Sequence, residues 1–142
     1  MTTNNAGLLL IKKFEGCKLT AYRCPAGKWT IGWGHTGNVQ EGDKITLSQA
    51  ETLLKMDLVS REKWLSMFGL KINENQFSAL ISLIYNIGQG NFIKSPVYKL
   101  VSVNPDDPAI KQAFLRHTYA AGKKLPGLER RRLEEIELYF SR

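Results

Sequence analysis

Residues 14–36 read FEGCKLTAYRCPAGKWTIGWGHT, and this stretch decides the fold. A proline at position 25 and a glycine at position 27 form a turn signal between two strand-like segments. We therefore predict a β-hairpin between Lys18 and Gly34, and we expect no other strands in the chain.

The segment after the turn alternates between bulky and small residues. In WTIGWG, residues 29–34, a period of two places both tryptophans and Ile31 on one face. Thr30, Gly32 and the following glycine lie on the other face. This second face is predicted to leave open space beside the strand for a ligand, although glycine in a strand is also typical of bulges and close backbone packing.

The turn also predicts the register of the hairpin. If Cys24 lies opposite Lys28, Tyr22 faces Thr30 and Cys24 is the diagonal neighbour of that threonine. A slip of one residue would move these side chains to the other face. The predicted register therefore brings a phenol, a thiol and a hydroxyl together.

Helical patterns dominate the rest of the chain, so we expect an α+β fold that is mainly α. The first helix is predicted to end at Gly16, directly after Glu15. The remaining start signals are capping boxes and prolines at the first helical position. They predict helices over about residues 46–68 and 73–88, and further helices that begin near Pro96, Pro108 and Pro126.

Composition predicts one basic domain without a membrane span. The chain has 142 residues, a net charge of +7 and a pI near 9.5, so its surface favours polyanions. The run Leu8–Ile11 is too short for a membrane span or a signal-peptide core, which predicts synthesis in the cytoplasm. Cys17 and Cys24 are expected as thiols, although the sequence leaves a bridge between them open. The basic cluster at residues 130–132 precedes three glutamates, which predicts ion pairs along a helix.

Glu15 is the only acidic residue among the first forty. It lies at the C-terminal end of a predicted helix, where the helix dipole disfavours a carboxylate. Partial burial by Phe14 acts in the same direction, and both effects favour the protonated carboxyl that a general acid needs. The alternative is a solvated carboxylate that pairs with Lys12 or Lys18.

The spacing of Glu15, Cys24 and Thr30, followed by IGWGHT, resembles the catalytic signature of the phage-type lysozymes. These are endolysin muramidases of glycoside hydrolase family 24. In that family the second position is Asp or, in some members, Cys, and the strand that follows reads GYGHT. The segments NENQFSALISLIYNIGQG and LPGLERRRLEEIELY resemble the central and C-terminal helices of the family, so the similarity covers nearly the whole chain.

The resemblance implies a single lysozyme-like catalytic domain over residues 1–142. It has a small hairpin lobe at roughly residues 16–45, a larger helical lobe in the remainder, and a cleft between the two lobes. The implied reaction is hydrolysis of the β-1,4 bond between N-acetylmuramic acid and N-acetylglucosamine in bacterial peptidoglycan, which lyses the host cell.

The resemblance also implies roles for individual residues. Glu15 is the acid, Thr30 holds the attacking water, and Cys24 lies beside that water as a hydrogen-bonding group. Cys24 has two other possible roles. It could act as a thiolate that stabilises or attacks the sugar cation, or as a redox-sensitive thiol. The residues expected to bind substrate or support the site are His35, Tyr22, Gly32 and Arg131, and either Arg131 or Arg132 is expected to turn towards Glu15 or the cleft.

No cofactor or nucleic-acid partner is expected, and the chain is expected to be a monomer. The resemblance implies release from the host cytoplasm to the periplasmic cell wall through a holin-type membrane pore. Three alternatives remain: a zinc amidase that uses Cys24, His35 and His117, an inactive basic wall-binding protein, and a basic helical nucleic-acid module. The chain lacks a closely spaced ligand pair such as His-Glu-x-x-His, which argues against the zinc amidase.

Overall fold

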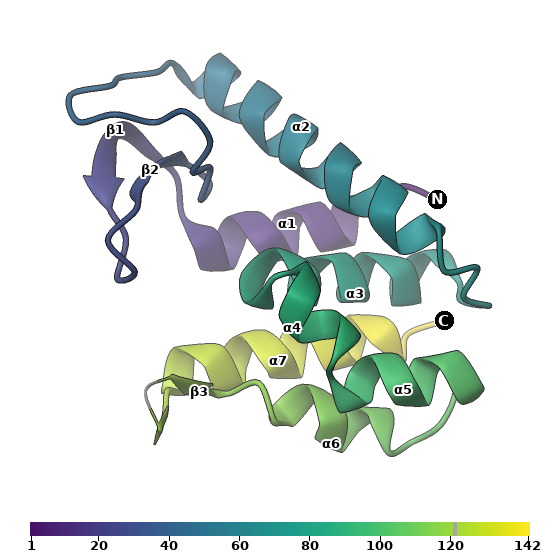
Figure 1. The fold of residues 1–142 in the computed structure, drawn as a ribbon. Coiled ribbons are helices and arrows are strands. Elements are labelled where there is room, and N and C mark those ends of the chain that lie inside the picture. The colour runs from purple at the N-terminus through teal and green to yellow at the C-terminus, as the bar shows by residue number, and fades with distance from the viewer. Residues whose placement is uncertain (121) are drawn as a thin grey trace. The chain divides into compact units, whose positions relative to one another are not determined.

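The computed structural model describes residues 1–120 and 122–142, and within this part of the chain it contains seven helices and two small antiparallel sheets (Figure 1). The α+β, mainly α fold class is therefore confirmed. In chain order the elements are α1 (Asn5–Glu15), β1 (Lys18–Arg23), β2 (Trp29–Gly32), α2 (Leu47–Ser66), α3 (Glu74–Ile87), α4 (Gln89–Ile93), α5 (Pro96–Val103), α6 (Ile110–Leu115), β3 (Tyr119–Ala120), β4 (Lys123–Lys124) and α7 (Pro126–Tyr139).

The chain divides into two compact units. The helical unit contains Met1–Ile11 and Arg61–Arg142, and the hairpin unit contains Lys12–Ser60. Both boundaries lie inside helices, the first in α1 and the second in α2. No helix of residues 1–120 and 122–142 has the length and apolar character that a membrane span requires.

The register of the hairpin is the predicted one. Tyr22 lies opposite Thr30 in the antiparallel pairing of β1 with β2. At the turn, the Cys24 amide donates to the Lys28 carbonyl at 2.9 Å. Gly27 has a φ of 82°, a conformation that favours glycine, which explains the turn signal.

The middle of β1 pairs with a segment that the sequence did not reveal as a partner. Between Lys18 and Tyr22 the register with β2 shifts. There, the backbones of Leu19 and Ala21 form hydrogen bonds of 2.9 Å with residues 43–45. Because of this irregularity, both ends of β1 pair with β2, while the middle of β1 pairs with residues 43–45.

The alternation predicted for β2 stops early, because the strand ends at Gly32 with a φ of 65°. The backbone then turns, and His35 pairs with Ile31 through two hydrogen bonds of 2.9 Å. A Cβ at Gly32 would lie 3.5 Å from the Cβ of Ala50 in α2. The open space predicted beside this glycine is therefore occupied by the helix.

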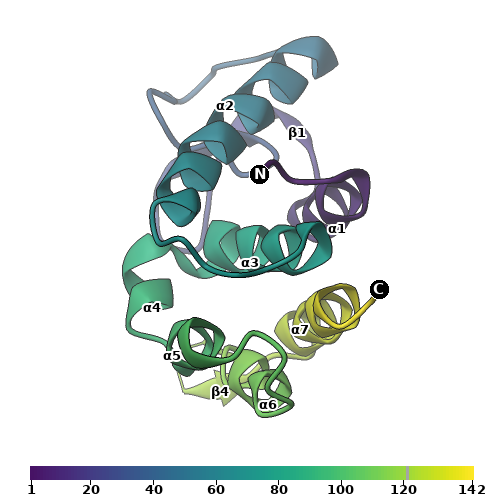
Figure 2. The same cartoon turned by 90° about the vertical axis from the view of Figure 1, so that its right-hand side faces the viewer.

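The helical unit is organised around α3, whose residues 76–84 are all buried. α3 and α7 lie side by side, and α6 packs against both α5 and α7 (Figure 2). The predicted capping box at the start of α3 is present, with reciprocal hydrogen bonds between Asn73 and Gln76. α1 also approaches α3 closely, because a Cβ at Gly7 would lie only 2.7 Å from the Cβ of Ser78.

Two predictions in the helical unit were wrong. The helix expected from Pro108 begins at Ile110, because the Asp107 carboxylate caps a preceding turn by accepting from the Ala109 amide at 2.9 Å. The expectation of a single hairpin missed β3 and β4. These strands have two residues each and are exposed, so they show no apolar alternation.

Candidate active site

Three of the predicted site residues, Glu15, Cys24 and Thr30, belong to the hairpin unit. Glu15 is the last residue of α1 and is half-buried, and Gly16 follows it with a φ of 68° that ends the helix. Burial raises the pKa of the Tyr22 phenol, and the negative charges of Glu15 and Cys24 raise it further. The carboxyl, the phenol and the thiol are therefore close enough to interact electrostatically.

The Cys24 thiol is more acidic than an ordinary cysteine. Its pKa is lowered mainly by a hydrogen bond from the Lys28 backbone, with further contributions from the Ala26 backbone and the Thr30 hydroxyl. Partial desolvation opposes this effect but does not reverse it. Hydrogen bonds to the charged form stabilise a thiolate, so the turn increases the negative charge available at this position.

Thr30 is almost completely buried, with 2% of its surface exposed. Its hydroxyl donates to the Lys28 carbonyl at 3.0 Å and is also within hydrogen-bonding range of the Cys24 sulfur. A hydroxyl has one proton to donate and two lone pairs. When it donates to the carbonyl, its lone pairs remain available to a water or to the thiol; when Cys24 is a thiolate, the hydroxyl can donate to sulfur instead.

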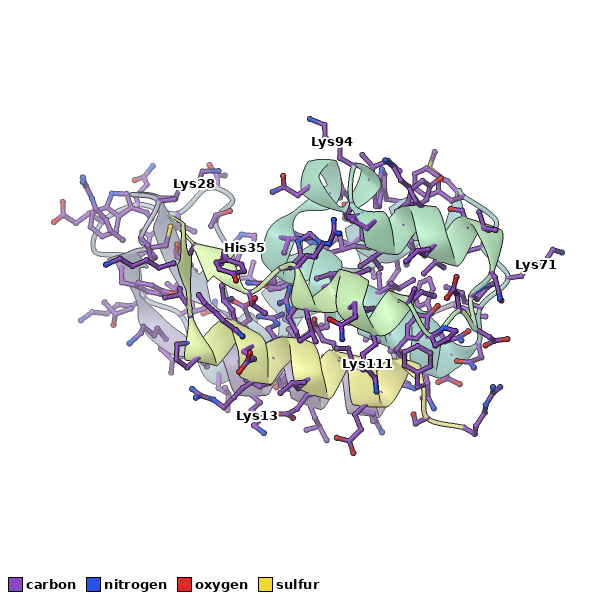
Figure 3. All side chains as sticks on the ribbon, turned by 90° about the horizontal axis from the view of Figure 1, so that it is seen from below. Lys13, Lys28, His35, Lys71, Lys94 and Lys111 are labelled. Atoms are coloured by element: carbon purple, nitrogen blue, oxygen red, sulfur yellow. The ribbon has the colours of Figure 1, made fainter. Side chains whose placement is uncertain are left out.

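His35 connects β2 to α2 within the hairpin unit. Its Nδ1 lies 2.8 Å from the Asp57 carboxylate and its Nε2 lies 2.8 Å from the Gly37 carbonyl oxygen. Both partners are hydrogen-bond acceptors, so a ring nitrogen that carries a hydrogen can donate to its partner. Because the His35 backbone also pairs with Ile31, next to Thr30, the imidazole fixes the strand that carries this hydroxyl. Figure 3 labels His35 and Lys28 among the side chains of this unit.

The structure does not favour the zinc alternative. Both ring nitrogens of His35 already have hydrogen-bond partners. Within residues 1–120 and 122–142, no group of three or more His, Cys, Asp or Glu side chains is arranged to hold a metal ion. Cys17 and Cys24 are free thiols.

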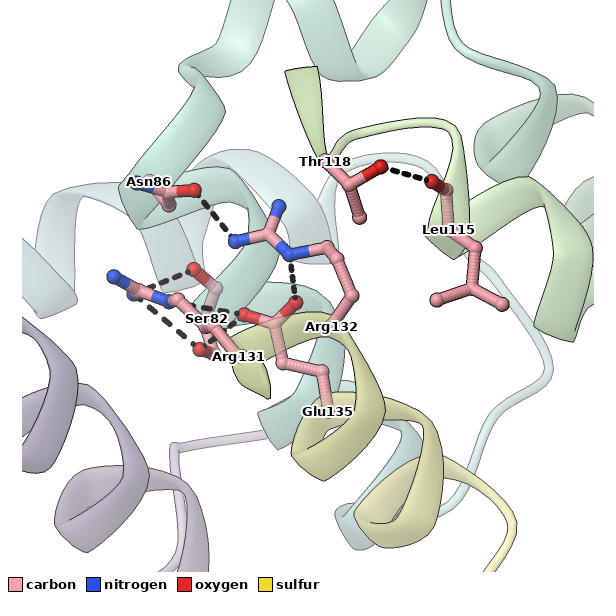
Figure 4. A network of polar contacts seen from close by, with 7 residues as sticks. All are labelled: Ser82, Asn86, Leu115, Thr118, Arg131, Arg132 and Glu135. Carbon is pink, nitrogen blue, oxygen red and sulfur yellow. Dashed lines mark hydrogen bonds and ion pairs between the residues drawn. The ribbon is translucent and has the colours of Figure 1, made fainter. Parts of the chain in front are cut away.

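Two of the three arginines of α7, Arg131 and Arg132, form a buried network in the helical unit (Figure 4). The Glu135 carboxylate lies 3.3 Å from Nε of Arg131 and 2.9 Å from Nε of Arg132. Arg131 donates to the Ser82 carbonyl at 3.1 Å, and Arg132 donates to the Asn86 side chain. The predicted ion pairs along α7 are thus confirmed for Glu135.

The partners of these arginines on α3 were not predicted, although the sequence of α3 contains a pattern that indicates them. Ser82 and Asn86 are polar residues four positions apart in the largely apolar segment 79–87, so they share one face of α3. Asp57 was not predicted as the partner of His35 either. The expectation that Arg131 or Arg132 turns towards Glu15 concerns residues of different units, and it stays a prediction.

A helical unit together with a hairpin unit that carries a carboxyl, a thiol and a hydroxyl defines the class of lysozyme-like glycoside hydrolases. Comparisons with known proteins lead to the same class. The family described as phage lysozyme matches residues 12–135. The chain belongs to this family, as the sequence signature predicted.

Relatives match over their whole length or over part of it. The endolysin of Acyrthosiphon pisum secondary endosymbiont phage 1 is 39% identical over 146 residues, with 99% of each chain covered. The endolysin of Salmonella phage P22 is 37% identical over 147 residues, again with 99% of each covered. The endolysin of Lactococcus phage c2 is 37% identical, but the chain spans only 60% of its length.

Solved structures also match the entire fold. The muramidase domain of SpmX from Asticaccaulis excentricus has a TM-score of 0.90 at 33% identity, with 99% of each chain covered. The active form of the P1 phage endolysin Lyz has a TM-score of 0.83 at 28% identity, with 96% of this chain and 84% of that chain covered.

Proposed function

We propose that this chain is an endolysin that hydrolyses the β-1,4 bond between N-acetylmuramic acid and N-acetylglucosamine in bacterial peptidoglycan. The observation that carries this proposal is the presence of Glu15, Cys24 and Thr30 on one compact unit, in the order and spacing of the family signature. The muramidase domain among the similar structures and the endolysins among the relatives support the same reaction.

Glycoside hydrolysis needs an acid for the leaving oxygen and a second group that manages the nucleophile. Glu15 is assigned as the acid, because it ends α1 next to the hairpin and occupies the first position of the family signature. Thr30 holds the attacking water through its lone pairs while its proton is donated to the Lys28 carbonyl. Cys24 accepts a hydrogen bond from the water, which is consistent with the lowered pKa of its thiol.

We also propose a cellular role for the chain. An endolysin acts on the cell wall, so this chain would work as a monomer in the periplasm after a separate holin-type pore opens the inner membrane. Expression of the chain alone in a bacterium should leave the cells intact until the membrane is permeabilised. Prompt lysis without permeabilisation would contradict the need for a pore.

Glu15→Gln tests the catalytic assignment, because the amide keeps the shape of the carboxyl but cannot donate its proton. Loss of a general acid typically costs about 10²- to 10⁴-fold in rate. The matched control is Glu41→Gln, which makes the same change at an exposed position of the hairpin unit. Turbidity loss of wall suspensions measures the rate, and circular dichroism checks that both variants fold.

Mass analysis of digested peptidoglycan tests the reaction itself. New reducing N-acetylmuramic ends identify a muramidase, free amino ends an amidase or peptidase, and anhydro ends a lytic transglycosylase. The proposal expects only the first product. Comparable lysis by Glu15→Gln and the wild type would refute the role of Glu15, whereas another product would refute the reaction.

A further inference from the structure

Lys18 carries a positive charge that an aromatic ring holds in place on the hairpin. It is the first residue of β1 and pairs with Gly32, just before the register shift. Its ammonium lies 5.5 Å from the centroid of the Tyr22 ring. A cation at this distance from an aromatic face is attracted to the ring. The ammonium therefore lies on the face of β1 that Tyr22 occupies.

That face leads directly to the candidate active site. Tyr22 lies opposite Thr30, and its phenol interacts electrostatically with Glu15 and Cys24. Lys18 thus provides a cation next to the candidate catalytic residues. Lys18, Tyr22 and the three candidate catalytic residues all belong to the hairpin unit.

The charge of Lys18 is not neutralised by a protein carboxylate. Within residues 1–120 and 122–142, no carboxylate lies within 4.0 Å of its ammonium, whereas Lys12 pairs with Glu51 at 2.6 Å. The Lys18 side chain is exposed. An ammonium has three N–H donors, and a contact with the face of a ring leaves donors free for an anion. This arrangement fits an anionic group that arrives with the substrate.

The proposed substrate carries such groups close to the bond that is cut. Each peptide stem is joined to the lactyl carboxyl of N-acetylmuramic acid and contains free carboxylates of its own. We infer that Lys18 is a specificity-determining residue that binds a carboxylate of the peptide stem. This inference rests on the proposed muramidase function and extends it to the recognition of the peptide.

Arg23 provides a matched control on the same strand. Its guanidinium lies 5.1 Å from the ring centroid of Trp29, which is its partner across the hairpin. Because Arg23 directly follows Tyr22 in a strand, it projects from the opposite face. Arg23 and Lys18 therefore share the charge and the type of aromatic contact, but only Lys18 is on the face of Thr30.

The experiment compares two substrates: soluble glycan fragments with their peptides, and the same fragments with the stem carboxylates converted to neutral amides. The readout is the ratio of kcat/KM for the two substrates. Lys18→Gln should lower this ratio about three- to tenfold, mainly through KM, as expected for the loss of one charge-assisted contact. Lys18→Arg should restore most of the ratio, and Arg23→Gln should leave it at the wild-type value.

An unchanged kcat/KM ratio in Lys18→Gln would overturn the inference. An equal decrease of the ratio in Arg23→Gln would also overturn it, because the effect would then come from general electrostatic attraction between the basic protein and the anionic substrate. If the wild-type chain cleaves neither substrate, the proposed function fails separately. Sedimentation with insoluble sacculi at low salt then decides the inference by itself. Weaker binding of Lys18→Gln than of Arg23→Gln supports it, and equal binding refutes it.

Discussion

Gly7→Ala tests the close contact between α1 and α3. An added Cβ would lie 2.7 Å from the Cβ of Ser78 and 2.9 Å from Cγ2 of Thr3. The first contact cannot be relieved by rotating a side chain, since each Cβ is bonded directly to its backbone. The helices would have to move apart, which would stretch the 2.9 Å hydrogen bond from the Asn4 amide to the Ser78 hydroxyl.

Two opposing effects set the magnitude. Alanine is favoured over glycine inside a helix by about 1 kcal/mol. Overpacking of a well-packed contact typically costs about 1–3 kcal/mol, and the weakened hydrogen bond adds about 1 kcal/mol. We therefore expect Gly7→Ala to lower the free energy of unfolding by about 1–3 kcal/mol. Gly90→Ala in α4 is the control, because no atom lies within 4 Å of its added Cβ, and it should stabilise the protein by up to about 1 kcal/mol.

Urea unfolding, followed by circular dichroism, measures both variants. At a typical slope of about 2 kcal/mol per molar urea, a difference of about 2 kcal/mol between the variants separates the two midpoints by about 1 M. A Gly7→Ala variant that is as stable as Gly90→Ala would show that the contact yields without cost, and the steric argument would then be refuted.

Four further predictions concern the thiols and the histidines. Cys24→Asp should keep activity within about tenfold, whereas Cys24→Ser should lose about 100-fold because serine does not ionise near neutral pH; wall turbidity measures both. Alkylation of Cys24 should begin at lower pH than alkylation of Cys17, because backbone hydrogen bonds lower the pKa of the Cys24 thiol while burial raises the pKa of the Cys17 thiol. Peptide mass analysis at a series of pH values measures the order, and the reverse order would contradict this prediction. His35→Asn should lower the free energy of unfolding by about 1–3 kcal/mol, since it breaks the 2.8 Å contact with Asp57, and an unchanged urea midpoint would refute that link. Burial, and then the charge of a nearby arginine, lower the pKa of His117, so this imidazole stays neutral in the folded state while it takes up a proton in the unfolded state. The free energy of unfolding should therefore fall as the pH drops below about 6.5. In urea titrations, His117→Gln should reduce this pH dependence of stability.

The features predicted correctly from the sequence are local ones. The hairpin register follows from the turn at Gly27, and the capping boxes at Thr46 and Asn73 each depend on residues three positions apart. Such contacts are encoded by spacing along the chain, so no tertiary information is needed to infer them.

The features that were missed depend on distant segments. Asp57 is 22 residues from His35, and no local pattern marks either residue as the partner of the other. The pairing of β1 with residues 43–45 is formed by a segment without strand alternation. The burial of Arg132 is also set by tertiary packing, since the sequence of α7 predicts only ion pairs along the helix.

The placement of both unit boundaries inside helices affects how the chain can be cut. The polypeptide passes between the units at Ile11–Lys12 and again at Ser60–Arg61, with helical hydrogen bonds on each side. Proteases prefer exposed, irregular segments, and neither passage offers one. Limited digestion of the native protein should therefore begin elsewhere and should not release the hairpin unit as a fragment. A proline at position 12 would remove a helical hydrogen bond at the first passage and turn it into a site of cleavage.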